Sequence, residues 1–183
     1  MKSKLLILII TVLGFLGMTQ TAWAFPADVE MLLDTRDCPV CILNDADLQG
    51  ADLTKVNLKV ASLMDANLQG ADLSGSNLML AYFNNADLSR AKLQAVDLNG
   101  AILTGAKLVG ADLSDAVLTQ ADLNDADLTG ANLRGAVFVG ARLGTANLQD
   151  ADMTGANLRG VARMQVRFCN TTMPDGAIEN RDC

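Results

Sequence analysis

Two cysteines three positions apart, Cys38 and Cys41, are the residues whose types and spacing come closest to a reactive site. Cys38-Pro39-Val40-Cys41 has the spacing of a dithiol redox centre, in which a thiolate attacks a disulfide. Such a centre starts a helix within a strand–helix–strand unit, and no such pattern surrounds this motif. Histidine, the commonest general base and metal ligand, is absent from the 183 residues. The sequence therefore favours a structural pair, keeps a minor redox role as an alternative, and predicts no catalytic residue, metal or cofactor.

The element that must position these cysteines is a five-residue repeat. From residue 41 to residue 160, a unit close to Ala-Asp/Asn-Leu-X-X recurs without insertion in 24 copies. A period of five fits neither a helix nor a long strand. Within one copy, a three-residue extended segment places Ala and Leu on one side and Asp or Asn on the other. The last two residues must turn the chain, and Gly, Asp and Asn are frequent there.

Departures from this consensus recur every twenty residues, which indicates how the copies stack. The unusual first positions are Val56, Ser76 and Val96, and one run of second positions is Ile42, Ser62, Tyr82, Ile102. If residues i and i+20 are stacked neighbours, four segments make one square coil, and the array has about six coils. With 50% hydrophobic but 4% aromatic residues, the interior must be a narrow, filled column of Leu and Ala. The prediction is an all-β solenoid.

Two runs of the array, residues 46–53 (Ala-Asp-Leu-Gln-Gly-Ala-Asp-Leu) and residues 131–136 (Ala-Asn-Leu-Arg-Gly-Ala), resemble the pentapeptide-repeat family. This resemblance implies a right-handed quadrilateral β-helix with the Leu and Ala columns inside. Residues 168–176 also resemble the ending of exported members from cyanobacteria and chloroplasts. Cytoplasmic members are known as acidic DNA mimics that bind type II topoisomerases, which implies an alternative function for this chain.

The first 24 residues have the pattern of an export signal. Lys2 and Lys4 precede a mostly apolar run over residues 5–18, and Ala22-Trp23-Ala24 supplies a small-x-small cleavage pattern. The apolar run is shorter than the ~20 residues that span a bilayer. We expect cleavage after Ala24, export to the periplasm or thylakoid lumen, and no stable membrane insertion of the mature protein.

The rest of the chain divides into the array and its two ends. We expect residues 25–40 to form an N-terminal cap with a short helix, because Val29, Leu32 and Leu33 have helical spacing. Residues 41–160 form the β-helix. Residues 161–183 form a degenerate coil and a C-terminal cap, with Phe168, Met173 and Ile178 at the inward phase and Arg163 where Leu belongs.

Export places all four cysteines in an oxidising compartment, so disulfides are the first expectation. Six coils stacked at ~4.8 Å separate the ends of the array by roughly 30 Å, whereas bridged Cα atoms lie within about 7 Å. The predicted pairs are therefore Cys38–Cys41, which closes the first repeat, and Cys169–Cys183, which closes the tail. The same distance excludes a zinc site built from all four.

Two outward columns of second-position residues are mostly acidic. In them Lys107 and Lys92 each lie between stacked aspartates and interrupt the negative row. Together with export away from DNA, this favours a solvated face and no nucleic-acid partner over the topoisomerase-binding alternative. The columns are Asp47, Asn67, Asp87, Lys107, Asp127, Asn147 and Asp52, Asp72, Lys92, Asp112, Asn132, Asp152.

One corner of the predicted rod is less polar than the others. A contiguous apolar patch often marks a contact surface, although such side chains can also simply stabilise stacked strands. We expect a non-enzymatic structural or interaction module whose corner binds an unknown protein partner or a second copy, with monomer or homodimer left open. The candidate residues are Val60, Met64, Met79, Leu80, Tyr82 and Ile102.

Overall fold

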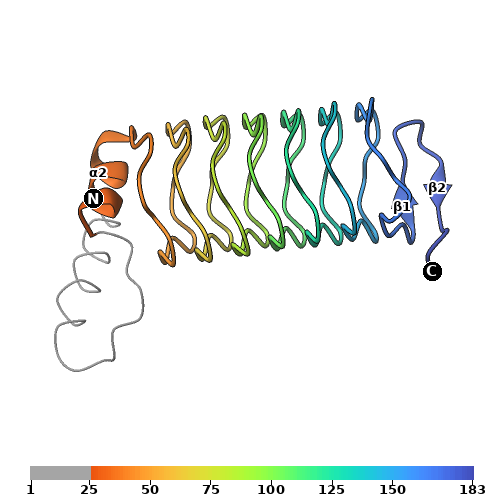
Figure 1. Cartoon of the computed structure of the whole chain (residues 1–183), viewed down its shortest axis with the longest axis horizontal. Helices are drawn as coiled ribbons and strands as arrows, with labels where there is room; N and C mark the ends of the chain where they lie inside the picture. Colours follow the sequence, from red (N-terminus) through yellow and green to blue (C-terminus); the bar gives the residue numbers. More distant parts are fainter. Residues whose placement is uncertain (1–25) are drawn as a thin grey trace, which may run out of the picture.

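The computed structural model describes residues 26–183, so the expected export signal and its cleavage after Ala24 lie outside the described residues. The described chain is a rod of stacked coils (Figure 1). Helix α2 lies at one end of the rod, and the short strands β1 and β2 lie at the other.

Parallel backbone bridges join residues twenty apart on four faces of each coil. Ile42 pairs with Ser62 on one face, and Asp47 pairs with Asn67 on the next. The coils are joined by bonds such as Ser62 N–H to the Cys41 carbonyl, 2.8 Å. Because each extended segment contributes one bridged residue, the faces are ladders of single bridges rather than longer strands. The predicted stacking of residues twenty apart, and with it the four-sided β-solenoid, is confirmed.

The interior is filled by the Leu and Ala columns. The third-position side chains from Leu43 to Met153 are buried, with Phe83 and Phe138 taking Leu positions. The buried Ser76 is satisfied, since its Oγ donates to the Leu53 carbonyl at 2.8 Å and accepts the Val56 N–H at 3.1 Å. Two hollows of the described chain, about 600 and 450 Å³, are open and lie at the C-terminal end.

Each corner is a tight turn made by the fourth and fifth positions of a copy, and the residue at the fifth position generally has left-handed backbone. In one such turn the Ala46 N–H donates to the Leu43 carbonyl at 3.2 Å, and the fifth residue of the copy, Asp45, has φ of 58°. Glycine, Asp and Asn tolerate this conformation best, which explains their frequency at the corner. The copy that ends in Thr145 is irregular, with the positive φ of 29° at Gly144 instead.

The N-terminal end is covered by α2, Pro26–Thr35. Leu32 is fully buried, and Val29 and Leu33 pack against the core. The Asp28 carboxylate accepts the Ile42 N–H at 2.8 Å. In the next coil the equivalent N–H, that of Ser62, bonds a carbonyl of the preceding coil. The Asp28 carboxylate therefore takes the place of the backbone carbonyl that a preceding coil would supply.

The solenoid begins one copy before residue 41, where the sequence placed its start. Asp37 already pairs with Asn57, and Cys38 is buried at the position that Leu takes in later copies. The predicted boundary between cap and array at residue 40 is corrected accordingly. This copy does not match the consensus because Arg36 takes the Ala position and Cys38 takes the Leu position.

At the other end the ladder continues beyond residue 160 but is interrupted. Asn147 pairs with Arg167 and Asp152 pairs with Thr172, whereas Arg163 is exposed. Strand β1, Thr171–Thr172, then pairs antiparallel with β2, Ile178–Glu179. The chain thus reverses over its last coil. Phe168 is buried as expected, but the inward orientation predicted for Ile178 is wrong, since that side chain is 53% exposed on the reversing strand.

Candidate protein-interaction surface

The four cysteines form the two predicted disulfides, Cys38–Cys41 and Cys169–Cys183. Cys38 and Cys41 are both buried in the core, under 5% exposed. Thiol–disulfide exchange needs a sulfur that an attacking thiolate can reach. The geometry therefore supports a structural closure of the first coil rather than a redox centre.

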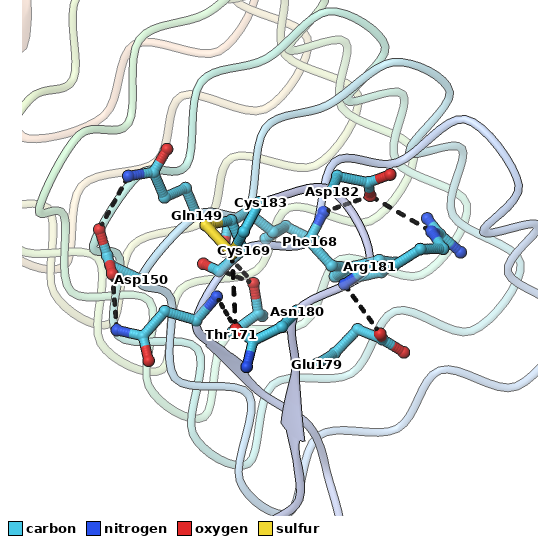
Figure 2. Close-up of a disulfide and its surroundings, with 12 residues drawn as sticks. Gln149, Asp150, Phe168, Cys169, Thr171, Glu179, Asn180, Arg181, Asp182 and Cys183 are labelled. Carbon is cyan, nitrogen blue, oxygen red and sulfur yellow. Dashed lines mark hydrogen bonds and ion pairs between the residues drawn. A yellow bond between two sulfur atoms is a disulfide. The ribbon is translucent and has the colours of Figure 1, made fainter.

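In the tail around Cys169–Cys183, side chains accept hydrogen bonds from backbone N–H groups of the last coil (Figure 2). The Asp182 carboxylate accepts the Phe168 N–H at 2.9 Å, and Asn180 Oδ1 accepts the Asn170 N–H at 2.8 Å. The Phe168 N–H, and then Arg181, hold the pKa of Asp182 below its usual value. As at Asp28, side-chain oxygens stand where the carbonyls of a further coil would be.

The acidic second positions have a local structural role that the sequence analysis missed. The Asp72 carboxylate accepts the N–H of Ser74, two residues later, at 3.1 Å, and also its hydroxyl at 2.6 Å. The Thr54 N–H, followed by the Arg36 guanidinium, lowers the pKa of Asp52 to about 2. The repeated Asp-x-Ser/Thr spacing was the available signal. These carboxylates secure the turns, which explains their recurrence without a ligand.

The same columns are partly neutralised along the rod. Lys92 Nζ lies 3.2 Å from Asp72, and Arg134 lies 2.9 Å from Asp152. Asn67 donates its amide to the Asp47 carboxylate at 2.9 Å. Within residues 26–183, no three His, Cys, Asp or Glu side chains are grouped as metal ligands. The acidic faces are hydrogen-bonded ladders rather than an uninterrupted negative surface.

The six candidate patch residues come together on one face and its flanking corners. The bridges Ser62 to Tyr82 and Tyr82 to Ile102 form the central column of the face. At one corner Val60 stacks on Leu80, and the adjacent Met79 carbonyl accepts the Val60 N–H at 2.9 Å. Met64 lies at the opposite corner of the same face. We call this surface the apolar face.

The apolar face is exposed, and it extends further toward α2 than the sequence analysis predicted. Leu80 is 48% and Tyr82 40% exposed, while Val60, Met79 and Ile102 are half-buried. Val40 and Ile42, stacked beneath Val60 and Ser62, are 67% and 44% exposed. Both continue the period of twenty. Val40 precedes the predicted start of the array at residue 41, whereas Ile42 lies inside the array but is not among the candidate patch residues. Toward the C-terminus the central column becomes charged, with Asp122 and Arg142 paired at 3.2 Å.

Large apolar residues with left-handed backbone line one edge of this face. Val40, Val60 and Leu80 occupy the fifth position of their copies, with φ of 64°, 62° and 57°. Left-handed backbone costs residues other than Gly roughly 1–2 kcal/mol, and β-branched residues adopt it rarely. Among the fifth positions from residue 40 to residue 160, these three carry the large apolar side chains, and all three stack in one column. Strain of this kind clusters at functional surfaces.

A four-sided β-solenoid closed at both ends, with a filled core and an exposed apolar face, defines a repeat protein of the solenoid class. The family described as pentapeptide repeats matches residues 41–78, 81–120 and 121–160. These ranges make up more than half of the chain. The chain belongs to the pentapeptide repeat family, as the sequence analysis expected.

Several solved structures are similar to this chain. HetL from the cyanobacterium Nostoc sp. strain PCC 7120, a pentapeptide repeat protein involved in heterocyst differentiation regulation, is 31% identical, with 78% of this chain and 76% of that chain covered and a TM-score of 0.43. A pentapeptide repeat protein from the Arabidopsis thaliana thylakoid lumen is 29% identical, with 54% and 66% covered and a TM-score of 0.49. QnrB1, a plasmid-mediated fluoroquinolone resistance protein, is 20% identical, with 75% and 70% covered and a TM-score of 0.47. No curated protein matches this chain.

Proposed function

We propose that this protein is an exported, non-enzymatic interaction module that binds another protein chain through the apolar face. The rod is right-handed and has about six coils, with α2 and the disulfide-closed tail as end caps. The observation that carries the proposal is the column of Val40, Val60 and Leu80. At these three positions large apolar side chains are combined with a strained, left-handed backbone and face solvent.

Within residues 26–183 the interior is filled, which supports a non-enzymatic role. The core is packed with Leu and Ala, its buried hydroxyls are bonded within the core, and both hollows are open surface depressions. The aspartates that could act as acids or bases are engaged in turns, with pKa values below the usual range at Asp52, Asp72 and Asp152. Groups held ionised in this way are poor proton donors near neutral pH.

Export to the periplasm or thylakoid lumen is supported by the signal-like first 24 residues and by the two disulfides. Within residues 26–183, no helix is long and apolar enough to cross a bilayer. The same compartment argues against a DNA-mimic role, and so do the bonded and interrupted acidic columns.

Retention of partners from an extract of the exported compartment tests this function. The double variant Leu80→Ser/Tyr82→Ser removes the two most exposed side chains in the middle of the apolar face. Asp87→Ser/Lys107→Ser, on the neighbouring acidic face, is the matched control. We expect a retained protein, whether another copy or a different chain, with the wild type and the control but not with the double variant. Equal retention by all three would overturn the proposal.

A further inference from the structure

We infer that the chain on the apolar face is a second copy, packed face to face and antiparallel. The twofold axis lies between the coil of Ser62 and the coil of Tyr82, and we call each coil along the rod a level. This inference rests on the proposed function and names its partner. It comes from the order of residues along the central column and the edge column, both of which the bridges and turn hydrogen bonds place in register.

The face is complementary to itself about that axis. Rotation places the small Ser62 opposite the large Tyr82 of the other copy, and Ile42 opposite Ile102. Along the strained edge, Val60 meets Leu80, and Val40 meets Gly100. The Leu80 side chain already covers Gly100, since a Cβ built on that glycine would lie 2.7 Å from Leu80 Cδ2. Two of these four pairings, Ser62 with Tyr82 and Val40 with Gly100, set a large side chain opposite a small one, and the other two set apolar side chains against each other.

Charge favours the same arrangement. Lys59, at the strained edge, falls opposite the uncharged Met79, and Asp65, at the far corner, falls opposite Asn85. No like charges meet over the four apolar levels, and like charges brought together at an interface are costly. In a parallel arrangement every central residue would meet its own copy. Asp122 would then face Asp122, and Arg142 would face Arg142. The antiparallel arrangement instead leaves that ion pair beyond the matched levels.

The paired surface is small, so the dimer is expected to be weak. Four levels at ~4.8 Å form a patch less than ~20 Å tall, well below the roughly 800 Å² per partner of a standard stable interface. We expect a dissociation constant of roughly 10 µM to 1 mM. Leu80→Ser/Tyr82→Ser should weaken it at least about tenfold, because these side chains lie at its centre.

Disulfide cross-linking between variants that each add one cysteine to the two native disulfides tests both the dimer and its register. Ile42→Cys and Ile102→Cys, prepared separately and mixed under mild oxidation, should form a disulfide between the two chains. Neither variant alone should do so, because each residue lies three levels, or ~14 Å, from its own copy. Asp47→Cys mixed with Lys107→Cys, at matched levels of the acidic face, is the control and should remain uncross-linked.

The outcomes separate this inference from the proposed function. A cross-link specific to the Ile42/Ile102 mixture, with wild-type dimers in sedimentation equilibrium that the double variant loses, supports the inference. Self-cross-linking of Ile42→Cys alone, or cross-linking of the control, overturns the antiparallel register. A monomer at all concentrations overturns the second copy. The proposed function then stands if a different chain is retained by the wild type and lost by the double variant, and it falls with the inference if nothing is retained.

Discussion

Val60 has φ of 62°, a conformation that β-branched residues rarely adopt. Asparagine tolerates this backbone better, so Val60→Asn should raise the free energy of unfolding by up to about 1 kcal/mol while weakening contacts at the apolar face. A stability gain paired with lost binding marks a residue kept for function. Chemical denaturation, followed by circular dichroism, measures the first effect.

The reverse change at an equivalent corner is the control for that prediction. Gly70 has φ of 64°, and a Cβ there would meet no atom within 4 Å. Gly70→Val therefore adds the same strain without a clash, and it should lower stability by about 1 kcal/mol. If Gly70→Val is neutral, or if Val60→Asn destabilises, valine is not strained at these corners and the functional reading of the column is lost.

The lowered pKa values of the second-position carboxylates predict how the stability of the fold depends on pH. Asp52, Asp72 and Asp152 have pKa values lowered in the folded chain, with Asp52 at about 2. A lowered folded-state pKa means that the unfolded chain binds protons first. Stability from these groups is thus complete above about pH 4 and lost as pH falls toward 2. Thermal unfolding across this range checks the direction. Asp52→Asn should flatten the curve, and a curve equally steep in that variant would contradict the assignment.

At the scale of elements, each end of the rod depends on side chains that replace a missing coil. Asp28 on α2 accepts the Ile42 N–H at 2.8 Å. Asp28→Ala leaves this amide without its partner and should cost about 1–2 kcal/mol of stability. Glu30→Ala, on an exposed position of the same helix, is the control and should have little effect. Hydrogen exchange at Ile42 gives the local readout, and unchanged protection in Asp28→Ala would contradict this capping role.

The two disulfides should differ in how readily they are reduced. Cys183 is exposed and Cys169 half-buried, whereas Cys38 and Cys41 are buried. A mild reductant should therefore open Cys169–Cys183 first and leave Cys38–Cys41 intact until the first coil unfolds. Timed alkylation followed by mass mapping follows both pairs. Faster reduction of Cys38–Cys41 would revive the redox interpretation of that motif.

The ends of the array were harder to predict than its middle. The periods of five and twenty residues predict the four-sided coil and its inward columns. Through the spacing of the coils, they also predict the disulfide pairing. They do not show that Cys38 takes a Leu position, because its copy also has Arg36 in place of the consensus Ala. They also place Ile178 inward by phase, although the reversal of β2 over β1 turns it outward. Chain reversal depends on tertiary contacts that periodicity does not encode.

The candidate surface was predicted in part for a related reason. Tyr82, Ile102 and Leu80 are visible in sequence because stacked residues are twenty apart. Val40 and Ile42 belong to the same columns, but Val40 precedes the predicted start of the array, and Ile42, although inside it, is not among the candidate patch residues. The backbone strain at Val60 cannot be read from residue types until the left-handed corner is known. This backbone conformation is the observation on which the proposed contact surface rests.

At the scale of the whole molecule, the rod is a closed column that leaves its outer faces for function. Three faces carry mainly polar ladders, and the α2-proximal part of the fourth carries the apolar face. An interaction module of this kind should therefore contact its partner from one side.

Site-specific photo-cross-linking in the native compartment tests this claim most directly. A photoreactive phenylalanine analogue is placed at Tyr82 and, in a second protein, at Asp87 on the adjacent acidic face. The account predicts one discrete adduct from position 82, with the mass of two copies of this chain, and none from position 87. Adducts from position 87, or no adduct from position 82, would contradict it.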